Sequence, residues 1–389
     1  MSNGRFLFVV PPFTGHVNPS VSVGQVLRAR GHQVAWVGHP GKVRPLLPPR
    51  ARLFALDDYV PKDHLEAVHQ RARTVRGLAA LKFLWEDFLL PLARASLDGV
   101  SAAVERFRPG VMVVDQQALA GALVARCNRI RWATFCTTSA GVTQPLRGLP
   151  RVQEWLHQRL DALQAEVGLP SWASPDLSPN LTVVFSSLAL VGGDPHRFPE
   201  TMHFAGPATP GRPSNGHTFP WEALMERPRI LVSLGTVNMD RGERFYRVVM
   251  EAVRDRPVQV IMVAPESLRS EAPDNVLIES YVPQLALLPH LDAVVCHGGH
   301  NTVCETLQQG LPLVVSPIRD DQPIVTEQVV DSGTGVRVRF GRVGPRALWE
   351  AIEAVLTDPS FKAAARAIRG SFATAGGARR AADLLEALS

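Results

Sequence analysis

The chain has 389 residues, more than one hydrophobic core usually organises, so its length favours two domains. Hydrophobic residues make up 46% and charged residues 20%, a balance that excludes a disordered or fibrous protein. The formal charge of +5 is mild, and the Lys and Arg residues are scattered along the chain. This distribution argues against nucleic acid as a partner.

Charge, Pro or Gly interrupts every apolar stretch before the ~18 residues that a bilayer span needs. Residues 6–10 are too few for the apolar region of a signal peptide. The cysteines at positions 127, 136, 296 and 304 form no CxxC pair, which indicates buried thiols in a reducing compartment. We therefore expect a cytoplasmic protein without a transmembrane segment.

The first part of the chain alternates apolar strands with amphipathic helices, a pattern typical of a parallel sheet. A strand at residues 5–10 leads through a loop into a helix at residues 20–30. Further strands are expected at residues 33–37, 52–55, 111–114, 132–136, 181–185 and 201–204. Residues 1–205 thus predict a doubly wound, Rossmann-like domain.

Residues 206–220 are dense in Pro, Gly and Ser and predict an interdomain linker. After them the alternation restarts, with strands expected at residues 229–234, 258–263, 276–279, 293–296, 312–315 and 335–338. Residues 221–377 thus predict a second domain of the same kind, and residues 378–389 a C-terminal segment. The predicted fold class is α/β, with two doubly wound parallel-sheet domains facing a central cleft.

Two polar residues are expected at the same edge of the parallel sheet of the first domain. His16 lies in the loop after the first strand, and Asp115 ends the strand at 111–114. An imidazole can take a proton from an alcohol when a second group fixes its tautomer. The pair therefore predicts a general base assisted by a carboxylate. A loop histidine without a catalytic role and an aspartate that caps the next helix are the alternative interpretations.

A glycine-rich turn at residues 296–305 is the second candidate site. Gly298 and Gly299 let the backbone approach a ligand, and Asn301 and Thr302 stand where a helix begins. The start of a helix exposes N–H groups that suit a phosphate. An ordinary strand-to-helix turn with a capping Asn or Thr is the alternative.

The motifs around this turn occur in the order of a known family. Tyr-Val-Pro-Gln at 281–284 precedes H-x-G-x-N-T-x-x-E at 297–305, and G-x-P at 310–312 and an Asp-Gln pair at 321–322 follow. With these motifs the chain resembles the UDP-glycosyltransferases of GT-B fold, in particular bacterial enzymes that glycosylate natural products. The resemblance covers almost the whole length and suggests that the C-terminal segment is a helix packing back on the first domain.

The resemblance implies an inverting, metal-independent O-glycosyltransferase. Its expected reaction moves a sugar, such as glucose, from a UDP-sugar to a hydroxyl of a small hydrophobic natural product of antibiotic, polyketide, terpenoid or carotenoid type. No cofactor is implied besides this co-substrate. No D-x-D triplet and no metal-ligand spacing stands in the sequence. A dTDP-deoxysugar donor is the alternative, and oligomeric state and peripheral membrane contact stay open.

Site residues carry over position by position. Diphosphate binding is expected from Ser233, Gly235, Thr236, His297, Gly299, Asn301 and Thr302. Nucleoside binding is expected from Tyr281, Val282, Gln284 and Glu305, and sugar binding from His300, Asp321 and Gln322. Tyr281 replaces the tryptophan of many relatives and keeps the capacity to stack. His300 stands where plant members carry tryptophan, so its imidazole would add a polar group near the donor.

The acceptor side gives a weaker signal. Residues 78–97 form an apolar segment that holds Phe83, Trp85 and Phe88. A buried core helix, the wall of an acceptor pocket together with Phe13, and interfacial membrane contact are the three interpretations.

Three other functions are weighed against transfer of a sugar. A nicotinamide dehydrogenase is disfavoured because no G-x-G-x-x-G follows the first strand. A sugar-nucleotide epimerase would bind the same nucleotide, but it would release no free nucleotide when an acceptor alcohol is supplied. A non-catalytic accessory protein should have lost His16 or the residues of the phosphate turn, and both are present.

Overall fold

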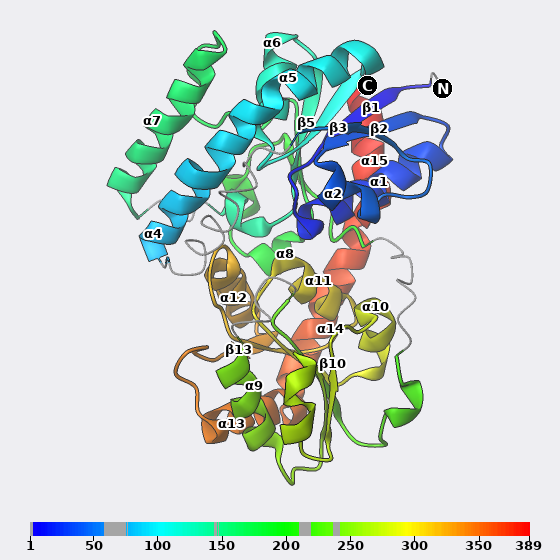
Figure 1. Cartoon of the computed structure of the whole chain (residues 1–389), viewed down its shortest axis with the longest axis vertical. Coiled ribbons are helices and arrows are strands. Elements are labelled where there is room, and N and C mark those ends of the chain that lie inside the picture. Colours follow the sequence, from blue (N-terminus) through cyan, green and yellow to red (C-terminus); the bar gives the residue numbers. More distant parts are fainter. Residues whose placement is uncertain are drawn as a thin grey trace. The chain divides into compact units, whose positions relative to one another are not determined.

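The computed structural model describes residues 3–57, 75, 77–143, 146, 148–209, 219–235 and 242–389. The chain divides into two compact units (Figure 1). The N-terminal unit comprises residues 1–187, 194–211 and 375–389, and the C-terminal unit comprises residues 188–193 and 212–374. Most of the predicted linker, residues 210–218, lies outside the described residues.

The boundaries differ from the predicted ones at residues 188–193, which group with the C-terminal unit although they precede the linker. This segment contains the helix α8 (Leu188–Val191). Leu190 is only 1% exposed and belongs to the hydrophobic core of the C-terminal unit, which explains the assignment.

A parallel sheet of seven strands organises the N-terminal unit, in the order β3-β2-β1-β4-β5-β6-β7. The strands are β1 (Arg5–Val9), β2 (Gln33–Gly38), β3 (Arg52–Ala55), β4 (Val111–Asp115), β5 (Arg131–Cys136), β6 (Leu181–Val184) and β7 (Met202–Phe204). The order reverses between β1 and β4, and open α/β sheets bind ligands at such reversals.

Helices cover both faces of this sheet. The main ones are α1 (Thr14–Ala29), α4 (Gly77–Lys82), α5 (Leu90–Phe107), α6 (Leu119–Cys127), α7 (Pro150–Glu166) and α15 (Gly377–Leu388). Short pieces are α2 (Pro40–Val43), η1 (Arg44–Leu46), the π-helical turn η2 (Phe83–Leu89), η3 (Ser139–Val142) and η4 (Pro195–Arg197).

Alternate residues of β1 supply the two cores of this unit. Phe6 and Phe8 are fully buried in a cluster with side chains of α1 and α15, whereas Leu7 and Val9 belong to a cluster with α5 and α6. Burial on both faces is why the parallel strands read as continuous apolar runs. Figure 1 shows α15, at the red end of the chain, beside α1.

The C-terminal unit contains a parallel sheet of six strands in the order β10-β9-β8-β11-β12-β13. The strands are β8 (Arg229–Ser233), β9 (Gln259–Val263), β10 (Val276–Glu279), β11 (Ala293–Cys296), β12 (Leu313–Val315) and β13 (Gly335–Arg337). This order reverses between β8 and β11.

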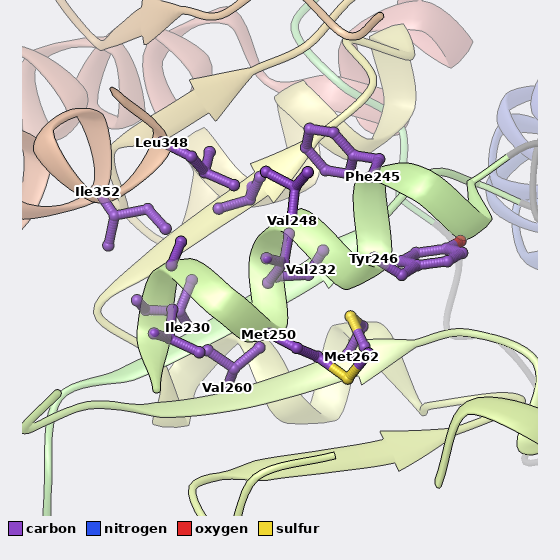
Figure 2. Close-up of a cluster of buried hydrophobic side chains, with 14 of the residues drawn as sticks. Ile230, Val232, Phe245, Tyr246, Val248, Met250, Val260, Met262, Leu348 and Ile352 are labelled. Carbon is purple, nitrogen blue, oxygen red and sulfur yellow. The ribbon is translucent and has the colours of Figure 1, made fainter. Parts of the chain in front are cut away.

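The helices of this unit also pack on both faces of the sheet. They are α9 (Glu243–Val253), α10 (Gln284–Leu287), α11 (His300–Gln308), α12 (Gln322–Asp331), α13 (Pro345–Thr357) and α14 (Pro359–Ala375), with short η5 (Trp221–Ala223), η7 (Glu266–Glu271) and η8 (Leu288–His290). Figure 2 shows one core, in which Ile230 and Val232 of β8 meet side chains of α9 and α13. Leu231 belongs to the other core, with α11 and α14.

Two expectations from the sequence are wrong in detail. The first helix begins at Thr14, not at residue 20, so the predicted loop around His16 is helical. Pro19 lies inside this helix, at a position where its nitrogen cannot donate a backbone hydrogen bond. Cys127 is exposed at the end of α6, whereas Cys136, Cys296 and Cys304 are buried as expected.

Among the described helices, we find none that combines the length and the apolar character needed to cross a bilayer.

Candidate active site

His16 lies in the first turn of α1, just after β1. Phe13 precedes the helix in an extended conformation, and its carbonyl accepts hydrogen bonds from the backbone N–H groups of His16 and Val17, both at 3.0 Å. The turn thereby presents His16 at the carboxyl edge of the sheet, beside the end of β4.

Asp115, the last residue of β4, holds the ring of His16. Its two carboxylate oxygens each lie 3.0 Å from Nδ1 of His16. The Asp115 side chain is 1% exposed and that of His16 17% exposed, so the pair is shielded but reachable from solvent. Asp115 Oδ1 also accepts a hydrogen bond of 2.9 Å from the N–H of Gln117. The carboxylate thus both shapes the turn before α6 and orients the histidine.

Thr137 is a third member of this cluster that the sequence analysis missed. It directly follows β5, is 4% exposed, and its hydroxyl lies 2.7 Å from Nδ1 of His16 and 2.9 Å from Oδ2 of Asp115. The only signal in the sequence is its place after a strand adjacent to β4, which many structural threonines share.

The helix that carries His16 is anchored firmly. The indole N–H of Trp36 on β2 donates to Ser20 Oγ at 3.0 Å, and Ser20 donates to the carbonyl of Val17 at 2.7 Å. At Gly24 a Cβ would overlap the Trp36 ring, so only glycine lets helix and strand approach this closely. Because core contacts of this kind resist displacement, α1 is a rigid support.

Two of the predicted acceptor residues meet beside His16. The ring of Phe13 stacks on that of Phe88 with centroids 5.0 Å apart, and it lies 5.5 Å from the His16 ring. Trp85 instead packs against a core cluster formed by α5, α6 and α7. Phe83 is half-buried in the same π-helical turn.

The apolar segment 78–97 is thus divided. Leu90 and Ala93 are buried in that core cluster, as the core interpretation expects, whereas Leu78 at its start is 57% exposed.

In the C-terminal unit, residues after β8 and β11 come together around His297. Its ring lies between Gly235 and Gly299, where an added Cβ would come within 2.7 Å and 2.5 Å of ring atoms. Ser233 ends β8, and its hydroxyl accepts a hydrogen bond of 3.4 Å from the N–H of Gly235. Thr236 falls outside the described residues.

Burial lowers the pKa of His297 to about 4, against the opposing effects of the Asp321 carboxylate and the Ser233 backbone. The imidazole is therefore neutral near pH 7. Its Nδ1 atom is buried and makes no hydrogen bond to the described residues. A buried polar atom of this kind calls for an explanation, and a ligand or an ordered water is one that would satisfy it.

The turn after β11 leads into α11. Gly298 has φ +84°, a conformation that favours glycine, and a Cβ there would also meet Thr326 and the backbone of Gln322. His300, Asn301 and Thr302 follow as the first residues of the helix, where the N–H groups have no partner within the helix.

His300 does not point its imidazole away from the protein. The residue is 5% exposed, and Nε2 lies 3.5 Å from Sγ of Cys304. Its ring therefore packs against Cys304 of the same helix, and its contribution to the donor site stays a prediction.

The nucleoside candidates lie in the loop after β10, at the start of α10 and in α11. Gln284 begins α10, and its Nε2 donates a hydrogen bond of 2.6 Å to Oε2 of Glu305. The structure thus joins two residues that stand 21 positions apart. Tyr281, in the loop after β10, is 37% exposed, and Val282 is 6% exposed.

Asp321 and Gln322 begin α12. The side-chain oxygen of Gln322 accepts hydrogen bonds from the N–H groups of Ile318 and Arg319, at 2.9 and 3.0 Å, and so fixes the loop before the helix. The charges of Asp321 and Arg319 both act on His297. Arg319, whose side chain is 14% exposed, is a cation near the turn that the sequence analysis missed.

Among the residues that the structure describes, no group of three or more His, Cys, Asp and Glu side chains could hold a metal ion.

Each unit is a Rossmann-like parallel sheet with helices on both faces, and a solved structure shares this architecture. The glycosyltransferase of kitacinnamycin matches with a TM-score of 0.80 and 26% identity, and each chain covers 100% of the other. The chain thus has the GT-B fold, as the sequence analysis predicted.

The sequence comparisons point to one family. Residues 218–369 match the family described as UDP-glucoronosyl and UDP-glucosyl transferase. The 4'-demethylrebeccamycin synthase of Lentzea aerocolonigenes is 29% identical, with 99% of both chains covered. Demethyllactenocin mycarosyltransferase of Streptomyces fradiae is 28% identical over 98% of this chain and 86% of its own. The chain is thus similar to the UDP-glycosyltransferase superfamily, to the family model over residues 218–369 and to curated glycosyltransferases over nearly its whole length.

Proposed function

We propose that this protein is an inverting, metal-independent O-glycosyltransferase that moves a hexose such as glucose from a UDP-sugar to a hydroxyl of a small hydrophobic natural product. The observation that carries the proposal is the histidine held by a buried carboxylate, 3.0 Å from Nδ1 to either oxygen, in a chain similar to this superfamily. This arrangement suits removal of a proton from an alcohol.

In the proposed mechanism, His16 takes the proton of the acceptor hydroxyl on Nε2 while Asp115 stabilises the cation that forms. The acceptor oxygen then attacks the anomeric carbon as its bond to the diphosphate breaks. Attack on the side opposite the leaving group inverts the anomeric centre. Because His16 and the donor residues belong to different units, turnover requires both units to engage the substrates.

The donor is proposed to lie along the C-terminal unit. Negative charge grows on the departing diphosphate, and donors aimed at that charge stabilise the transition state. The start of α11, the neutral His297 and the turn after β8 are suited to this task. The proposed diphosphate contacts are Ser233, Gly235, Thr236, His297, Gly299, Asn301 and Thr302.

The remaining proposed donor contacts lie before and after this turn in the sequence. Tyr281 is proposed to stack on the base and Val282 to contact its edge, with the bonded pair Gln284 and Glu305 on the ribose. Asp321 and Gln322 are proposed to bind sugar hydroxyls together with the backbone of His300. The proposed reaction uses no cofactor beyond the nucleotide sugar.

A hydrophobic acceptor is proposed from the stacked rings of Phe13 and Phe88, which lie next to the proposed base. The names of the relatives support a natural product as acceptor, since they refer to rebeccamycin and lactenocin derivatives. A relative named for mycarosyl transfer keeps a dTDP-deoxysugar as the second candidate donor.

Release of free nucleotide tests the proposal. The full chain is incubated with UDP-glucose, or with a dTDP-deoxysugar, together with a panel of hydrophobic alcohols, and nucleotide and glycoside are quantified. We expect release that depends on the acceptor, an equal amount of glycoside with inverted configuration, and no loss of rate with EDTA. Products with retained configuration, or loss of rate on chelation, would contradict the mechanism.

A further inference from the structure

The hydroxyl of Thr137 contacts both members of the proposed catalytic pair. It lies 2.7 Å from Nδ1 of His16 and 2.9 Å from Oδ2 of Asp115, at a position that is 4% exposed. The distance to His16 is shorter than the 3.0 Å between His16 and either carboxylate oxygen. A hydroxyl this close to both groups influences which ring nitrogen of His16 carries the proton.

The protons in this cluster can be placed by counting donors. A threonine hydroxyl has one hydrogen, and here it points to the Asp115 carboxylate, which can only accept. The same oxygen must therefore accept from His16. The two carboxylate oxygens beside Nδ1 also only accept, so all three of these oxygens are acceptors toward Nδ1. The arrangement requires a proton on Nδ1, which leaves Nε2 as the basic nitrogen.

We propose that Thr137 is a positioning residue that fixes the tautomer and the orientation of His16. The inference rests on the proposed function of His16 as the base. When the acceptor O–H bond breaks, its proton forms a new bond to Nε2, and Nδ1 keeps its own proton. Thr137 and Asp115 then both accept from the Nδ1–H of the imidazolium, which is a stronger donor than that of the neutral ring. The electron pair of the acceptor oxygen forms the bond to the sugar.

The backbone holds Thr137 in place for this role. The strand β5 lies between β4 and β6 and brings residue 137 next to the end of β4. The next hydroxyl, that of Thr138, instead accepts from the N–H of Ala140 and caps the turn η3. A β-branched side chain has few rotamers, so two simultaneous contacts of its hydroxyl define the position of Thr137.

Replacement by valine tests the proposal because it removes the hydroxyl and keeps the shape. We expect Thr137→Val to lower kcat by about 10- to 100-fold, as loss of one hydrogen bond to a charged group predicts, with little change in the KM of either substrate. Thr137→Ser keeps the hydroxyl and should restore kcat to within a few fold of wild type.

Thr134→Val is the matched control. Thr134 lies on the same strand, is fully buried, and its hydroxyl makes hydrogen bonds of 2.9 and 2.8 Å with the backbone of Asp176 and Ser178. The same substitution there should cost thermal stability but leave kcat near wild type. Melting temperatures of all variants separate misfolding from loss of the contact.

Action through His16 is tested in a His16→Ala background, where Thr137→Val should cause no further loss. Equal losses in both backgrounds, or a Thr137→Val enzyme with the wild-type kcat, would overturn the proposal. If His16→Ala itself retains full turnover, the proposed base is wrong instead.

The ¹⁵N chemical shifts of the His16 ring decide the inference without any turnover. We expect a protonated Nδ1 in the wild type and Thr137→Ser, and a mixture of tautomers in Thr137→Val. An Nδ1–H signal of unchanged strength in Thr137→Val would contradict the proposed role even if no substrate is found.

Discussion

The two units use one topology to build two different histidine sites. In each sheet the strand order reverses once, between β1 and β4 in the first and between β8 and β11 in the second. His16 follows β1 and His297 follows β11, so both rings lie at a reversal. Their surroundings differ, because acceptors surround Nδ1 of His16 whereas Nδ1 of His297 is buried without a hydrogen bond to the described residues.

This difference teaches how one scaffold separates two tasks. A carboxylate beside an imidazole favours the cation and therefore suits a base. Burial between two glycines favours the neutral ring, which suits a ligand that brings its own charge. The reversal of strand order supplies the place in both units, and the immediate neighbours decide the chemistry.

The largest expected effect is on the first site. We expect His16→Ala to lower kcat by ~10² to 10⁴, the usual contribution of proton transfer by a placed side chain, with nucleotide affinity nearly unchanged. Steady-state rates and calorimetric titration with UDP measure the two quantities. His157→Ala is the control, because His157 also pairs with a carboxylate, that of Asp161, but on the surface of α7. Equal turnover of the His16 variant and wild type would show that His16 is not the base.

The pH dependence of stability probes the second site. The pKa of His297 is about 4 in the folded protein, against 6.5 for an unperturbed histidine. As the pH falls from 6.5 to 4, the unfolded state binds the proton first. The free energy of unfolding therefore decreases by up to about 3 kcal/mol over this range, and above pH 6.5 it has its full value.

Denaturant titrations of wild type and His297→Asn between pH 4 and 7 measure this effect. The variant should show a shallower dependence, because its side chain does not titrate. Parallel curves for the two proteins would mean that His297 is not held neutral by burial.

A smaller effect is expected from a methyl group beside His297. In Gly299→Ala the added Cβ would come within 2.5 Å of Nε2, so the ring must shift. Overpacking of this size costs about 1–3 kcal/mol, which predicts a roughly 5- to 150-fold loss of UDP affinity if the ring contacts the diphosphate. Gly344→Ala is the matched control, since Gly344 precedes α13 and a Cβ there meets nothing within 4 Å. Unchanged affinity in Gly299→Ala would remove His297 from the donor site.

The smallest effect concerns the helix α15. Glu386 accepts from Arg30 at 2.6 Å and contacts Nε2 of His32 at 2.8 Å, which ties α15 to the residues just after α1. Glu386→Ala should lower stability by about 1 kcal/mol or less, as for other partly exposed ion pairs. Glu350→Ala, which removes an exposed pair with Arg346 in the C-terminal unit, should cost less still. Thermal unfolding of both variants provides the measurement.

The sequence predicted most of the fold because parallel strands buried on both faces leave continuous apolar runs. The start of α1 was misplaced because Pro19 and the polar residues before it are typical of a loop. A helix tolerates such residues when tertiary contacts anchor it, here through Ser20, directly after Pro19, and Trp36. Local propensity is weak evidence where tertiary contacts decide.

The candidate site was predictable only where residue types are unusual for their position. His16 comes shortly after β1 and Asp115 ends β4, and their meeting across 99 positions could be inferred from the sheet edge. Thr137 gives no comparable signal, because a buried threonine after a strand is common and its contact with His16 spans 121 positions. The inward turn of the His300 ring toward Cys304 is a packing choice that spacing cannot reveal.

The position of α15 has a consequence for how the protein is made. Ala381, Ala382 and Leu385 of this helix belong to the same buried cluster as Phe6 and Phe8 of the first strand. During synthesis on a ribosome the residues of the first strand emerge early, yet their core is completed by a helix that follows the whole C-terminal unit in the chain. The C-terminal unit therefore has all of its residues available before α15 emerges, and the N-terminal unit keeps apolar surface uncovered until then.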